Sequence, residues 1–82
     1  MKLSEPQKRV LKTMAELDCK VTVRRGYAMN LVRFLEHGDV PAPSAAIVHT
    51  LCRRGLLVPN RERHRFTIYR LTPKGREVAK EL

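Results

Sequence analysis

Residues 43–75 read PSAAIVHTLCRRGLLVPNRERHRFTIYRLTPKG, and this stretch decides the fold. Helical spacing of apolar residues is followed by short apolar runs that alternate as in strands. The pattern predicts four successive segments: a helix over 44–54, a strand at 56–58, an arginine-rich turn at 60–64 and a strand over 65–71. The stretch therefore predicts a helix followed directly by a cationic β-hairpin.

The ends of these segments carry recognisable stop and start residues. Gly55 suits the left-handed position that ends a helix, and Thr72-Pro73 is typical of an N-cap followed by proline in the first helical turn. In the helix over 44–54, the apolar side is predicted to consist of Ile47, Val48, Leu51 and Cys52. The opposite side is small at its start and basic at its end, and comprises Ala45, Ala46, His49, Thr50 and Arg53.

The N-terminal part predicts another helix. Ser4 and Gln7 have the spacing of a capping box, and Pro6 is tolerated in a first turn. Apolar residues then recur at helical spacing as far as Leu17, so the helix is expected to end near Asp18.

Residues 20–38 are compatible with two structures. Lys20 to Arg25 alternate and are β-branched, which favours a strand, and Gly26 permits a turn. Downstream, Leu31, Phe34 and Leu35 fit a helix closed by Gly38, whereas Met29, Leu31, Arg33 and Leu35 fit a returning strand. We favour the hairpin, because Val21 and Val23 need a pairing partner, and a short helix is the alternative.

The chain length and the net charge indicate the number of domains and the kind of partner. The 82 residues fit one domain over 1–82, and the net charge of +9 predicts a polyanionic partner. No apolar stretch reaches the roughly 18 residues that a membrane span needs, and the first residues lack the apolar core of a secretory signal. We therefore expect a cytoplasmic protein without a membrane partner.

The sequence offers no pattern for catalysis, a cofactor or a metal. Cys19 and Cys52 are not in C-x-x-C spacing, and His37, His49 and His64 are scattered. No paired carboxylates, glycine-rich loop or nucleophile motif is present. The expectation is a binding protein rather than an enzyme, with the two thiols in packing roles.

Two motifs resemble a known superfamily. Leu51-Cys52-Arg53-Arg54-Gly55-Leu56-Leu57, and then Tyr69-Arg70-Leu71-Thr72-Pro73-Lys74-Gly75-Arg76, are similar to the winged helix-turn-helix of MarR- and PadR-like regulators. A hairpin at 20–37 departs from those regulators and resembles small phage and proteobacterial winged-helix proteins, whose relatives include a toxin family that inhibits topoisomerase I. The resemblance implies an α+β winged helix: three helices, a C-terminal hairpin wing, and an additional hairpin or short helix at 20–37.

The expected function is binding of double-stranded DNA, as by a small transcriptional regulator. The helix over 44–54 would enter the major groove and the basic wing at 60–65 would meet the backbone or minor groove. The candidate contacts are Ser44, Ala45, His49, Thr50, Arg53, Arg61, Arg63, His64 and Arg65. The alternative is a phage- or toxin-type inhibitor whose basic wing binds a host protein. A monomer or weak homodimer is expected, because no long apolar stripe remains once the core is filled.

Overall fold

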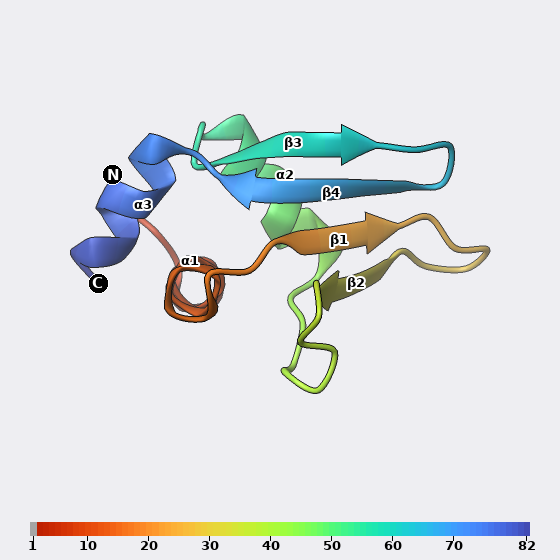
Figure 1. The fold of residues 1–82 in the computed structure, drawn as a ribbon, viewed down its shortest axis with the longest axis horizontal. Coiled ribbons are helices and arrows are strands. Elements are labelled where there is room, and N and C mark those ends of the chain that lie inside the picture. Colours follow the sequence, from red (N-terminus) through yellow and green to blue (C-terminus); the bar gives the residue numbers. More distant parts are fainter. Residues whose placement is uncertain (1) are drawn as a thin grey trace.

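The computed structural model of the protein describes residues 2–82 as three helices and one antiparallel sheet (Figure 1). In chain order the elements are α1 (Glu5–Leu17), β1 (Val21–Arg24), β2 (Leu31–Phe34), α2 (Ala45–Arg53), β3 (Leu57–Glu62), β4 (Phe66–Leu71) and α3 (Pro73–Lys80). The strands are ordered β2-β1-β4-β3. The expected α+β class, with three helices and a C-terminal hairpin, is confirmed.

Residues 20–37 contain a hairpin, and the alternative of a short helix is wrong. β1 and β2 pair with Val21 opposite Phe34 and Arg24 opposite Leu31. The apolar alternation differs from the predicted one, because Phe34 is buried whereas Leu31 is 50% exposed. β2 therefore directs Val32 and Phe34 toward the core, and Leu31 and Arg33 away from it.

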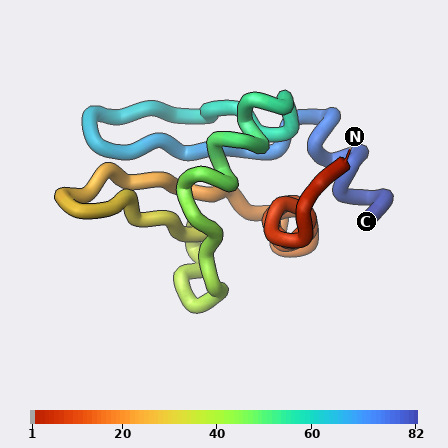
Figure 2. Tube along the Cα trace, turned by 180° about the vertical axis from the view of Figure 1, so that it is seen from behind, coloured from red at the N-terminus to blue at the C-terminus, as the bar shows by residue number. Residues whose placement is uncertain are grey.

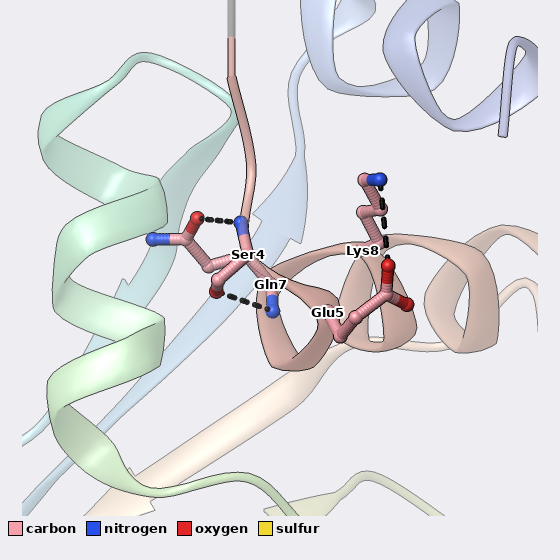
Figure 3. A network of polar contacts seen from close by, with 4 residues as sticks. All are labelled: Ser4, Glu5, Gln7 and Lys8. Atoms are coloured by element: carbon pink, nitrogen blue, oxygen red, sulfur yellow. Dashed lines mark hydrogen bonds and ion pairs between the residues drawn. The ribbon is translucent and has the colours of Figure 1, made fainter.

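α1 begins with the predicted capping box, as Figure 3 shows. The Ser4 hydroxyl accepts from the backbone N–H of Gln7 at 3.4 Å, and the Gln7 side-chain oxygen accepts from the Ser4 N–H at 2.9 Å. Two N–H groups that the helix cannot pair are thereby satisfied. The helix ends at Asp18, which is the C-cap and adopts a left-handed conformation.

β3 is longer than predicted, and the turn after it is shorter. The strand continues through Pro59 to Glu62, so the predicted turn at 60–64 is wrong in its first half, and the connection is reduced to residues 63–65. Pro59 is tolerated because β3 is an edge strand. Asn60 has no partner in the register with β4, since Pro59 lies opposite Tyr69 and Arg61 opposite Ile68. This is a β-bulge, and it changes which way the following side chains point.

The sheet is covered on one face only. Seen from behind, α2 crosses the sheet, and α1 and α3 lie together at one end (Figure 2). Buried residues from all three helices and all four strands meet on that covered face, and the largest fully buried side chains are Leu11, Met14, Leu51, Leu56, Leu57, Val21 and Val48. We call the covered face the inner face and the opposite one the outer face.

The start of α3 is fixed against the end of α2. Gly55 ends the helical segment with a φ of +77°, the left-handed region that favours glycine. The Thr72 hydroxyl donates to the Gly55 carbonyl oxygen at 2.7 Å and accepts from the Gly75 N–H at 2.9 Å. Gly75 is buried against the Leu56 carbonyl, where a Cβ atom would overlap the oxygen.

This close approach predicts that Gly75→Ala destabilises the protein by about 1–3 kcal/mol, because backbone rather than a flexible side chain would have to move. The free energy of unfolding from urea denaturation measures the change. The matched control is Gly38→Ala, since a Cβ at Gly38 would contact nothing within 4 Å. The control is expected to stay within about 0.5 kcal/mol of the wild type. Equal stability of the two variants would contradict the proposed close packing.

Candidate nucleic-acid interface

The tips of the two hairpins lie side by side at the same end of the sheet (Figure 1). β1 pairs with β4, and this register sets Arg24 opposite Phe66. The pairing continues one step further, because the Arg25 N–H donates to the Arg65 carbonyl oxygen at 2.7 Å. Basic residues that are far apart in the sequence are thus adjacent in the fold.

A polar hollow of about 200 Å³ lies between these tips and α2 on the inner face. It is lined by Val23, Arg25, Asn30, His49, Arg63, His64, Arg65, Phe66, Thr67 and Tyr69. Four of the nine predicted contact residues are therefore brought together: His49, Arg63, His64 and Arg65. We call Arg25, Arg63, His64 and Arg65 the tip cluster.

His49 connects α2 to the hollow. It is exposed, and its ring lies edge-on to the ring of Tyr69, with 6.3 Å between centroids and 63° between planes. Tyr69 is only 8% exposed. Burial raises the pKa of its phenol, with Cys52 and Glu62 adding to the effect, so the hydroxyl is neutral at physiological pH. The hollow thus has an uncharged aromatic floor beneath cationic walls.

Thr50 and Arg53 continue the exposed side of α2. The Thr50 hydroxyl donates to the Ala46 carbonyl oxygen at 2.9 Å and accepts from the Arg53 guanidinium at 3.2 Å. Thr50 is therefore already engaged, whereas Arg53 is held at the surface with most of its donors free. Together with Ala46 and His49, they form a stripe at helical spacing, which we call the α2 stripe.

Ser44 and Ala45 lie apart from the hollow, at the N-terminal end of α2. The Ser44 hydroxyl is the N-cap and accepts from the Ile47 N–H at 3.4 Å. Ala45 is half-buried and packs against the core, not on the exposed side where the sequence pattern put it. Neither residue lines the hollow.

Arg61 is separated from the rest of the predicted wing. The bulge at Asn60 sets Arg61 opposite Ile68 of β4. On its other side, Ile68 pairs with Thr22 of β1. The residues on either side of Thr22 are buried, so Thr22, Ile68 and Arg61 share the outer face. Grouping Arg61 with Arg63 and Arg65 on one turn is therefore wrong.

Arg25 is the main site residue that the sequence pattern did not place with the wing. The sequence alone shows the pair Arg24-Arg25 before Gly26 as a basic patch, and it does not indicate which segment of the chain lies beside this patch. Its position beside Arg65 depends on the β1–β4 pairing, which joins segments more than forty residues apart. Asn30 and Tyr69 enter the hollow for the same reason.

Positive charge is concentrated around the sheet. Residues 19–72 hold ten of the 17 Lys/Arg but only three of the eight Asp/Glu. Within residues 2–82, the ion pairs are Lys8–Glu5, Arg76–Asp18 and Lys80–Glu77, all on or beside α1 and α3. None of them involves an arginine of the tip cluster, so this cluster has no charge-neutralising partner in the described chain.

Two further observations concern other classes of site. Over residues 2–82 no three His, Cys, Asp or Glu side chains are grouped so as to hold a metal ion, and no helix there has the length and apolarity to cross a membrane. Cys19 and Cys52 are free thiols. Burial raises the pKa of Cys19, and the Asp18 carboxylate adds to this, so the reactive thiolate is disfavoured there.

Comparison with known proteins identifies no relative. No protein-family model matches the chain, and no curated protein or solved structure gives a significant match.

The unpaired tip cluster predicts an unusual salt response of stability. Added salt screens repulsion among exposed like charges, so raising NaCl from about 20 to about 200 mM is expected to increase wild-type stability in urea. The triple variant Arg25→Ala/Arg63→Ala/Arg65→Ala is expected to lose most of that increase, on the order of 0.5 kcal/mol.

The charge-matched control removes the three ion-paired cations, Lys8, Arg76 and Lys80, by alanine substitution. Because these side chains contact carboxylates, the control is expected to retain a salt response at least as large as that of the wild type. A response equally reduced in both variants would show that net charge, rather than clustering, governs it.

Proposed function

We propose that the protein binds double-stranded DNA as a winged-helix protein, with α2 in the major groove and the hairpin tips on the flanking phosphates. One observation carries the proposal. Three arginines without acidic partners surround a hollow that is shared with an exposed helix. The order α2, β3, β4 supplies the helix followed by a hairpin that such proteins use.

α2 has the dimensions and surface that the major groove requires. A single helix fits that groove and brings side chains to the base edges. The α2 stripe begins with a small residue, Ala46, which permits close approach, and continues with His49 and Arg53 as hydrogen-bonding side chains. His49 and Arg53 are therefore the proposed base-reading residues.

The tip cluster supplies the phosphate contacts. Arg25 and Arg65 are joined through their backbones, so their side chains extend from a defined platform rather than from independent loops. Arginine is suited to phosphate because its guanidinium donates two parallel hydrogen bonds. Ser44 and Ala45 contribute at the far end of α2, where free backbone N–H groups favour a phosphate.

A single copy presents one α2 stripe and one tip cluster. We propose a monomer or weak homodimer that reads one half-site per copy. Selective regulation of transcription would then depend on two neighbouring half-sites or on a second protein.

Salt dependence of duplex binding tests the phosphate role of the tip cluster. Each neutralised phosphate contributes about −0.9 to the slope of log K against log salt, so the three arginines of the tip cluster, Arg25, Arg63 and Arg65, predict a slope near −3. Arg63→Ala/Arg65→Ala is expected to make the slope less steep by about 2, because two phosphate contacts are removed. Fluorescence anisotropy with a random duplex pool measures both values.

The control for this experiment is Arg33→Ala/Arg61→Ala, which removes the same charge from the outer face. It is expected to leave the slope close to that of the wild type. Absence of duplex binding at low salt, or equal loss in the two variants, would contradict the proposed interface.

Sequence preference tests the role of α2. Arg53→Ala is expected to change the preferred duplex at one base position, with a loss of about 1–3 kcal/mol in discrimination there. The matched control is Arg54→Ala, since the Arg54 guanidinium donates to the Lys2 carbonyl oxygen at 2.8 Å and is engaged within the protein. Selection from a random duplex library followed by sequencing reports the preference. An unchanged preference in Arg53→Ala would remove Arg53 from base reading.

A further inference from the structure

No helix covers the outer face of the sheet (Figure 1). The registers of the three strand pairs align Arg33, Thr22, Ile68 and Arg61 across the full width of the sheet. The two arginines occupy the two edge strands, and the less polar Thr22 and Ile68 lie between them. This row has a weakly polar centre with a positive charge at each end.

The adjacent rows also combine arginines with apolar residues, but in a different order across the sheet. On one side, Leu31, Arg24 and Phe66 lie opposite one another on three strands, and on the other side Arg70 lies opposite Val58. The arginines are exposed, Leu31 is 50% exposed, and Phe66, Ile68 and Val58 are half-buried. The less polar side chains therefore follow a diagonal of the sheet, from Leu31 on β2 through Thr22 and Ile68 to Val58 on β3, with guanidinium groups on both sides.

No acidic side chain belongs to this surface. Glu62 pairs with Thr67 on the inner face, and the other acids lie on the helices or in the loop that follows β2. None of the outer arginines forms an ion pair within residues 2–82. A partner would therefore have to supply the negative charges that pair with these arginines.

A second copy of the same face is a poor partner. Stacking two such faces would bring arginines against arginines, and like charges across an interface are costly. Duplex DNA is also poorly matched, because phosphates gain nothing from Ile68, Val58 and Leu31. A single-stranded nucleic acid would need exposed aromatic platforms, and Phe66, half-buried, is the only aromatic residue in these rows.

We propose that the outer face binds an amphipathic helix of an acidic partner protein. The apolar side of that helix would lie diagonally across the strands, over Thr22 and Ile68 and toward Leu31 and Val58. Its flanking carboxylates would pair with Arg24 and Arg61 on one side and with Arg33 and Arg70 on the other. α2 and the polar hollow lie on the opposite face, and the inference does not depend on DNA binding. Of the tip cluster, Arg63, His64 and Arg65 also border the outer face, where they line a cavity with Thr22, Arg24 and Phe66.

The width of the sheet supports this occupant. Arg33 and Arg61 are three strand spacings apart, about 14 Å between their backbones. An α-helix with its side chains is about 10–12 Å across. One helix therefore fits between the two arginines, and both guanidinium groups can reach carboxylates on its flanks.

A designed peptide tests the proposal. The probe is a capped peptide of about 18 residues, long enough to form a helix, with leucine on one side and glutamate on both flanks. A scrambled peptide of identical composition and charge lacks the apolar stripe. Calorimetry is expected to show binding of the amphipathic peptide at least tenfold tighter than that of the scrambled one. Equal affinities would show attraction by charge alone and overturn the proposal.

Variants locate the peptide on the protein. Arg33→Ala/Arg61→Ala, and separately Ile68→Thr, are each expected to weaken peptide binding at least tenfold. The matched control Arg9→Ala/Lys12→Ala removes the same charge from exposed positions of α1 and is expected to leave binding within twofold. Ile68→Thr retains a β-branched side chain that suits a strand, so the fold is kept while the apolar contact is lost. Loss of binding only in Arg63→Ala/Arg65→Ala would place the peptide at the tips and overturn the proposal.

Amide chemical shifts give an independent readout on the wild-type protein. Addition of the amphipathic peptide is expected to shift the resonances of Thr22, Leu31, Arg61 and Ile68, and to leave those of the α2 stripe unchanged. Sedimentation of the free protein tests whether a second copy of the chain occupies the outer face instead. Self-association that is abolished by Arg33→Ala/Arg61→Ala would identify a second copy on this face and overturn the proposal.

Discussion

The antiparallel pairing of β1 with β4 joins two hairpins that are distant in the sequence, and both candidate surfaces are built on it. An isolated two-stranded hairpin is marginally stable in water, whereas four strands with one buried face can hold together. The same pairing brings Arg25 beside Arg65 on the inner side and aligns Thr22 with Ile68 on the outer side. Stability and the arrangement of the charged groups therefore depend on one set of backbone hydrogen bonds.

The charge distribution divides the molecule into two parts with different roles. α1 and α3 carry all of the ion pairs found in the described chain, and their packing supports the end of the sheet. The hairpins and α2 carry the unpaired arginines. Unpaired like charges reduce the stability of the folded state, and proteins retain such arrangements at binding surfaces. The helical end thus acts as the scaffold, and the hairpin end presents the charge.

Local sequence signals predicted the element boundaries well, because each rests on chemistry within a few residues. The Ser4–Gln7 capping box, the left-handed Gly55 and the Thr72-Pro73 helix start are all present as expected. The hairpin at 20–37 was also predictable, since Val21 and Val23 need a pairing partner and Gly26 permits a turn. The pairing of β1 with β4 was not predictable, because no local sequence pattern indicates which strands of two different hairpins will pair. Consequently the sequence named His49, Arg63, His64 and Arg65 as candidate contacts, and only the structure places Arg25 beside them around one hollow.

The position of Arg61 was not predicted for a different reason, namely the bulge at Asn60. This bulge also determines which charges each face of the sheet presents. Side chains alternate along a strand, so one extra residue exchanges the two faces for everything beyond it. If Asn60 were paired opposite Ile68 in a regular register, Arg61 would lie on the inner face and Glu62 on the outer one. The charge of each surface is therefore set by the pairing register of an edge strand as much as by the residue types in it. A change from the bulged to a regular register at this one residue would redistribute opposite charges between the two sides while leaving the composition of the chain unchanged.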